Sequence, residues 1–133
     1  MNILEKSIEE LENSYWGEPP VDSYVVGACH KARQKPLKLL SNEEIRLLAG
    51  QKIGLKYILP IAVEILKRNA FIEITYFEGD LLLQILRLDI SDWEGNTQAL
   101  DDFKEIVRQN MPMIAECKDI SVTLAEKHTM SRG

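Results

Sequence analysis

With 133 residues, the chain has the length of one domain and is long enough to enclose a single hydrophobic core. Hydrophobic residues make up 45% of the sequence and charged residues 28%, which excludes a disordered chain and a membrane protein in favour of a globular one. The formal net charge of -5 disfavours binding to nucleic acids, whose phosphates it would repel, and favours basic partners.

The N-terminal segment and the cysteines bear on where the protein works. The residues from Met1 to Lys6 include charged side chains and lack the apolar stretch of a secretory signal peptide. No apolar run approaches the ~20 residues that a membrane-spanning helix needs. Cys29 and Cys117 are too few for the disulfide framework of a small secreted domain, so both are expected as reduced thiols. We therefore expect a cytoplasmic protein.

Apolar residues at spacings of three and four predict helices from the start of the chain. The segment 2–15 has this pattern, and Pro19 and Pro20 stop it because neither can donate a backbone hydrogen bond. A second helix is predicted over 23–33. The residues expected on its inner side are Tyr24 or Val25, Ala28 and Ala32.

Two further helices are predicted before residue 70. Ser41 and Glu44 have the spacing of a capping box, which predicts a helix from there to about Gly50. Apolar residues in 53–66 cover most of the helix circumference, so this segment is expected to be the central and most buried helix. Pro60 should either bend that helix or mark its first turn.

The second half of the chain is less regular. Residues 71–77 are rich in β-branched and aromatic side chains, which suits a short strand or an extended connector. A helix is predicted to begin at Asp80, 91–96 has the composition of a loop, and 100–110 again has helical spacing. Polar and apolar residues alternate over 120–124, which allows a short strand or a last irregular helix.

These elements predict a mainly α fold. We expect a compact single-domain helical bundle over residues 1–133, because no linker or internal repeat divides the chain. A short extended or β segment near 71–77 and 120–124 is the open alternative.

Residues that could carry catalysis are few and scattered. Cys29 and His30 are adjacent, and neighbours on a helix point about 100° apart. A nucleophilic pair would need His128 to fold back on Cys29 or Cys117, and no local signature supports it. The sequence has no paired metal-ligand spacing, and the glycines of 50–54 lack the spacing of a phosphate loop. We therefore expect neither a metal ion nor a cofactor, and no enzyme.

A concentration of acids lies in and around the predicted loop. With only Lys104 among them, they are Asp89, Asp92, Glu94, Asp101, Asp102 and Glu105, here called the acidic surface. Trp93 lies in their midst, and a tryptophan beside acids is a candidate anchor for a protein interface. The alternative is that Trp93 packs into the core and the acids only make the surface soluble.

Several segments together resemble the immunity proteins of contact-dependent growth inhibition systems. The resemblance covers about Leu11 to Leu86, and its most specific parts are the Gly-Gln-x-Ile-Gly-Leu and Gly-Asp-Leu-Leu segments. The matching residues are Trp16-Gly17-Glu18-Pro19-Pro20, Ser23-Tyr24, the segment from Cys29 to Leu37, Glu44-Ile45-Arg46, Gly50-Gln51-Lys52-Ile53-Gly54-Leu55, Tyr57, Pro60, Ala62, Glu64, Leu66 and Gly79-Asp80-Leu81-Leu82. The family pattern has prolines where this chain has Ala70 and Glu78, so the 71–78 connector is expected to differ in shape.

The resemblance implies a cytoplasmic protein that binds and neutralises the C-terminal toxin domain of such a system. We expect the toxin to be of the nuclease type and the acidic surface around Trp93 to cover its basic face, by steric and electrostatic blocking. If the acidic surface is not the binding site, the next candidate is the face of Glu9, Glu10 and Glu12 or the connector near Glu73 and Glu78. The alternative functions are a helical adaptor without a toxin partner and a cysteine-dependent enzyme.

Overall fold

The computed structural model describes residues 2–131, with side chains up to residue 125. Within that range the chain forms helices and no strand, so the prediction of a mainly α fold is confirmed. The α-helices are α1 (Ile8–Glu12), α2 (Tyr24–Gln34), α3 (Asn42–Gly50), α4 (Leu55–Arg68), α5 (Asp80–Leu86), α6 (Thr97–Gln109), α7 (Met111–Glu116) and α8 (Lys118–Ser131). Short 3-10 helices are η1 (Ile3–Glu5), η2 (Leu37–Leu39) and η3 (Ile90–Trp93). None of the helices in the described part is long and apolar enough to cross a membrane.

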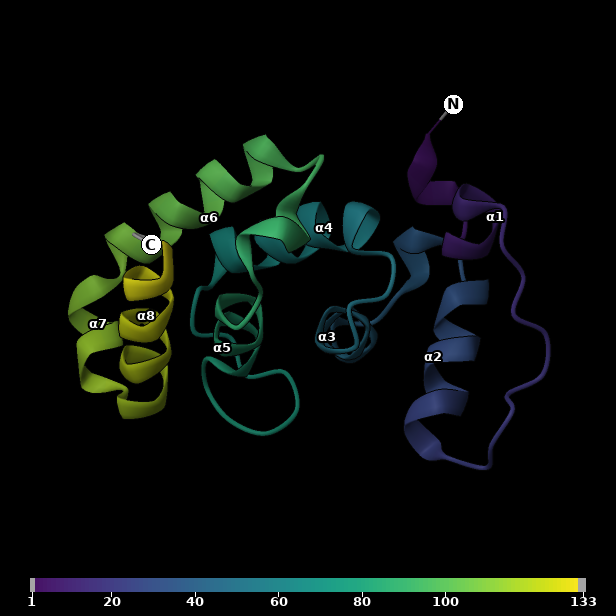
Figure 1. Cartoon of the computed structure of the whole chain (residues 1–133), viewed down its shortest axis with the longest axis horizontal. Helices are drawn as coiled ribbons and strands as arrows, with labels where there is room; N and C mark the ends of the chain where they lie inside the picture. The colour runs from purple at the N-terminus through teal and green to yellow at the C-terminus, as the bar shows by residue number, and fades with distance from the viewer. Residues whose placement is uncertain (1, 132–133) are drawn as a thin grey trace.

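The helices follow one another along the long axis of the molecule (Figure 1). The N-terminal α1 and α2 lie at one end, α3, α4 and α5 in the middle, and α7 and α8 at the other end. Helix α3 packs on α2, α4 and α5, while α6 packs on α4 and α8 packs on α5. This arrangement leaves one continuous hydrophobic core that runs from Ile8 to Ile120.

Side-chain caps decide where the first helices begin and end. The predicted capping box of α3 is confirmed, because Ser41 accepts from the Glu44 N–H and the Glu44 carboxylate accepts from the Ser41 N–H. A second capping box, Ser7 with Glu10, starts α1, and Asn13 in the left-handed conformation ends it. The helix predicted over 2–15 is therefore wrong in length, since these caps divide it into η1 and α1.

The predicted central helix is α4. Five of its side chains are buried: Ile58, Leu59, Ala62, Val63 and Leu66. Pro60 lies in its sixth position and is exposed, so it does not mark the first turn, and its ring faces solvent where the missing donor is least costly.

The backbone shows which structure is formed by 71–77 and by 120–124, the two segments for which a β alternative was open. Residues 71–79 form neither a strand nor an extended connector: they make a loop of turns and bends with a single antiparallel bridge, Glu73 to Glu78, and the Gly79 N–H donates back to the Phe71 carbonyl at 3.1 Å. The strand alternative for 120–124 is wrong, because these residues lie inside α8. Ile120 and Leu124 are four residues apart, and helical geometry places both on one face, where Ile120 is buried and Leu124 packs against the core.

Candidate functional site

Trp93 lies in the core. Its indole is 5% exposed and stacks on the ring of Phe103 in α6, with 5.4 Å between the ring centroids. Of the two roles considered for this residue, the geometry corresponds to packing. Trp93 therefore holds η3 against α6 from inside, while its acidic neighbours stay at the surface.

Most of the acidic surface is engaged with cations of the chain itself. Lys52 lies 3.0 Å from the Asp92 carboxylate and 3.6 Å from that of Asp89, and these contacts, led by the Asp92 hydrogen bond, raise the pKa of Lys52. Asp92 also closes the capping box of η3 by accepting from the Asp89 N–H. Lys67 donates to Asp102 at 3.0 Å, and this bond lowers the pKa of the Asp102 carboxyl.

Two acids are left with unbalanced charge. Glu105 pairs with Arg108 one turn further along α6, whereas Glu94 and Asp101 are exposed and make no ion pair with any described residue. The six acids thus lie beside four bases, counting Lys52, Lys67, Lys104 and Arg108. The acidic surface keeps a surplus of negative charge, concentrated at Glu94 and Asp101.

The Trp-Gly-Glu-Pro-Pro segment is fastened to α2 by a buried arginine. The Arg33 side chain is fully buried, donates to the Glu12 carboxylate at 3.0 Å and to the Ser14 carbonyl at 2.9 Å, and lies 3.9 Å over the Trp16 ring. His30 meets Trp16 edge to face, and its Nδ1 lies 3.1 Å from the Gly17 carbonyl. Motif residues from both segments therefore build one structural joint.

Asp80 gives the 71–79 connector its shape. Its carboxylate is buried and accepts from the backbone N–H groups of Ile74, Thr75 and Tyr76 at 2.9, 2.8 and 2.9 Å. Burial alone would raise the pKa of the Asp80 carboxyl, but the three backbone hydrogen bonds and the charge of Arg46 outweigh it and lower that pKa. The connector is thereby held in one conformation.

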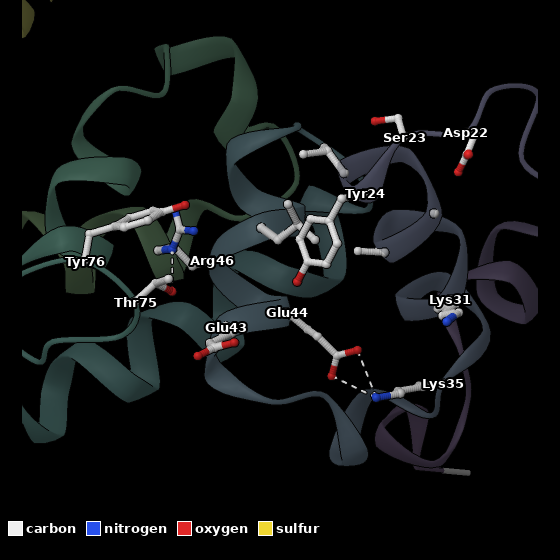
Figure 2. A pocket seen from close by; sticks show the side chains of 14 residues that line it. Asp22, Ser23, Tyr24, Lys31, Lys35, Glu43, Glu44, Arg46, Thr75 and Tyr76 are labelled. Atoms are coloured by element: carbon white, nitrogen blue, oxygen red, sulfur yellow. Dashed lines mark hydrogen bonds and ion pairs between the residues drawn. The ribbon is translucent and has the colours of Figure 1, made fainter.

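A groove opens between α2, α3 and the connector (Figure 2). Its volume is about 550 Å³, and Tyr24 and Tyr76 stand at it with exposed fractions of 85% and 71%. The prediction that Tyr24 or Val25 faces inward is wrong, because the buried side of α2 is Cys29, His30, Ala32 and Arg33. No local pattern indicates that Tyr24 and Tyr76 line one groove, because they lie 52 positions apart in the sequence.

The cysteines are poorly placed for nucleophilic chemistry. Cys29 is buried, and burial raises the pKa of its thiol, which disfavours the reactive thiolate. Cys117 is half-buried on the far side of the core, at the junction of α7 and α8. The side chain of His128 lies outside the described residues. Among the residues that the structure describes, no group of His, Cys, Asp and Glu could hold a metal ion.

A family model described as CDI immunity proteins matches residues 10–103. The chain belongs to this family. Comparison with curated proteins and with solved structures gave no significant match. In this family member the matched region contains the Arg33 joint, the Asp80 connector and the groove, and it ends inside α6, before α7 and α8.

Proposed function

We propose that the protein neutralises the toxin domain of a CDI system by binding it, and that it performs no reaction of its own. Membership of the family supports a toxin-neutralising role. The burial of Cys29 supports the absence of chemistry, because a buried thiol with a raised pKa is a weak nucleophile. The place of action proposed is the cytoplasm, where a delivered toxin would meet its substrate.

The acidic surface is the proposed contact for a basic face of the toxin, as a nuclease-type toxin would present. The main support for this proposal is that Glu94 and Asp101 are exposed and unpaired among the described residues. A partner that covers these two carboxylates would therefore break no ion pair within the protein. Opposite charges steer two proteins together and speed their association. Because Trp93 is buried, it serves here as the support of the surface.

Protection of a cell requires tight binding. A nanomolar dissociation constant corresponds to about -12 kcal/mol, and interfaces of that strength bury roughly 1,600 Å² over both partners. One partner would then cover about 800 Å² of the immunity protein, a small part of its 8186 Å² accessible surface. A chain of this size can therefore block a toxin face sterically.

The first experiment is co-expression with the toxin domain encoded next to this gene, with cell survival and co-purification as the two readouts. Survival together with a stable complex is the expected result. Survival without a complex would contradict neutralisation by binding.

The second experiment tests the surface. A Glu94→Gln and Asp101→Asn variant should associate with the toxin about three to ten times more slowly than the natural protein at low salt, with weaker dependence on salt. A matched control, Glu116→Gln with Asp119→Asn, removes the same charges from exposed positions of α7 and α8. Equal association rates for both variants, measured by stopped-flow fluorescence, would place the interface elsewhere.

A further inference from the structure

The two tyrosines at the groove are more exposed than the other large apolar side chains of the described residues. Tyr24 is 85% exposed and Tyr76 71%. Neither ring belongs to the hydrophobic core, and most of the surface of each is open to a partner. Tyrosine is among the residues that most often anchor protein interfaces, because a rigid ring offers a large contact area and a polar tip.

The groove that carries these rings is already ordered. Arg46 of α3 donates to the Thr75 hydroxyl at 3.3 Å and lies 4.9 Å over the Tyr76 ring, while Asp80 fixes the backbone beneath. Ser23 caps the start of α2 beside Tyr24 by accepting from the Val26 N–H. A partner would therefore meet a surface in place, and binding would pay little for ordering it.

The lining of the groove is balanced in charge. Three acids (Asp22, Glu43 and Glu44) and three bases (Lys31, Lys35 and Arg46) line it. Lys35 and Glu44 form an ion pair at 2.9 Å, which Figure 2 marks with dashed lines. Val25, Ala28 and Leu47 contribute apolar groups to the same lining. This balance suits an uncharged occupant with an apolar tip and does not suit a phosphate or a strongly basic segment.

We propose that the groove is a second contact surface for the toxin, and that it receives an uncharged loop of the toxin domain with one apolar side chain placed between Tyr24 and Tyr76. This inference rests on the proposed function. It assigns the two surfaces different tasks, because the acidic surface has charge but a buried tryptophan, whereas the groove has exposed rings but no surplus charge. The acidic surface speeds association, and the groove slows dissociation.

The test is the dissociation rate of the complex of full-length protein with its toxin domain. Tyr24→Ala and Tyr76→Ala should each raise that rate about tenfold to thirtyfold and leave the association rate unchanged. Tyr15→Ala is the matched control, because Tyr15 is 64% exposed and does not line the groove. It should dissociate at the rate of the natural protein. Urea denaturation of the free variants checks that all three remain equally stable.

The outcomes separate the two proposals. If the natural protein binds the toxin and both groove variants dissociate at its rate, the groove inference is overturned while the proposed function stands. If the natural protein does not bind the toxin, the proposed function fails first. If the natural protein is a dimer by light scattering and Tyr24→Ala makes it a monomer without changing toxin dissociation, the groove contacts a second copy and the inference is likewise overturned.

Discussion

Replacing Asp80 with asparagine tests how the 71–79 connector is held. The Asp80 carboxylate accepts three backbone hydrogen bonds, two of them on one oxygen. In Asp80→Asn the amide oxygen can keep the bonds from Thr75 and Tyr76, but the amide nitrogen then faces the Ile74 N–H, donor against donor. Hydrogen bonds to a charged group contribute about 1.5–3 kcal/mol each, and the two that remain lose their charge. We expect the variant to lose about 3 kcal/mol of unfolding free energy.

The measurement is urea denaturation followed by tryptophan fluorescence. For a chain of this length, a loss of about 3 kcal/mol corresponds to a fall in melting temperature of about 10 °C. Asp101→Asn is the control, because Asp101 is exposed on α6 and has no ion pair with the described residues, so its variant should stay within about 0.5 kcal/mol of the natural protein. Equal stability of the Asp80 and Asp101 variants would refute the reasoning.

The dependence of this loss on pH gives a second check. The pKa of Asp80 is lower in the folded protein than the ordinary value of 3.8, so the unfolded chain takes up the proton first as the pH falls. The stability that the carboxylate supplies is therefore fully present above about pH 5 and is lost as the pH falls through the folded pKa. The difference between the natural protein and Asp80→Asn should be constant near neutral pH and shrink below pH 4. A difference that grows in acid would contradict the assignment.

Three further predictions concern the joint and the core, each measured by urea denaturation. Arg33→Ala should cost about 3 kcal/mol and shift the emission of Trp16, because it removes a fully buried cation whose partners stay behind. Gly54→Ala should cost about 2 kcal/mol more than Gly95→Ala, since both have positive φ but only at Gly54 would the added Cβ lie 2.8 Å from a buried side chain. Trp93→Ala should cost about 3–5 kcal/mol, and an unchanged stability would show that the indole does not pack in the core.

The parts of the fold that sequence could predict are those set by local chemistry. The capping box of Ser41 and Glu44 joins groups three residues apart, so its signal lies within one helical turn. The segment 120–124 could not be assigned in this way, because its apolar residues satisfy both a strand period and an i,i+4 helix face. Contact of α8 with α5, far away in sequence, decides for the helix, and Ile120 is buried at that contact.

The candidate site was harder to predict because it depends on burial. The sequence around a tryptophan flanked by acids is the same whether its side chain faces water or the core. The stacking of Trp93 on Phe103 in the structure distinguishes these two placements. Tyr24 and Val25 begin α2, and helical spacing allowed either of them to face the core. In the structure both are exposed. Tyr76 is placed by Asp80 through backbone hydrogen bonds that leave no pattern in the sequence.

The segments that resemble the family serve two different purposes in the structure. Arg33 and Asp80 are buried and tie distant backbone segments together, so the fold itself requires them. Tyr24 belongs to the same set of motif residues, yet it is largely exposed and is not part of the core. Its exposure agrees with the role in toxin binding that we propose for the groove.

The positions of the two surfaces constrain how a toxin can engage them. In Figure 1, α6 lies on one side of the molecule, and the connector and the start of α2 lie on the other, with α3 and α4 between them. A toxin that touches both must reach around the middle of the molecule, and the interface would then exceed the roughly 1,600 Å² of a standard complex. Electrostatic attraction between two proteins extends over about 8 Å at physiological salt, whereas the van der Waals attraction of a ring requires direct contact. Under the proposed function the acidic surface would therefore guide the encounter before the groove is occupied, and changes at the two surfaces should alter the association and dissociation rates separately.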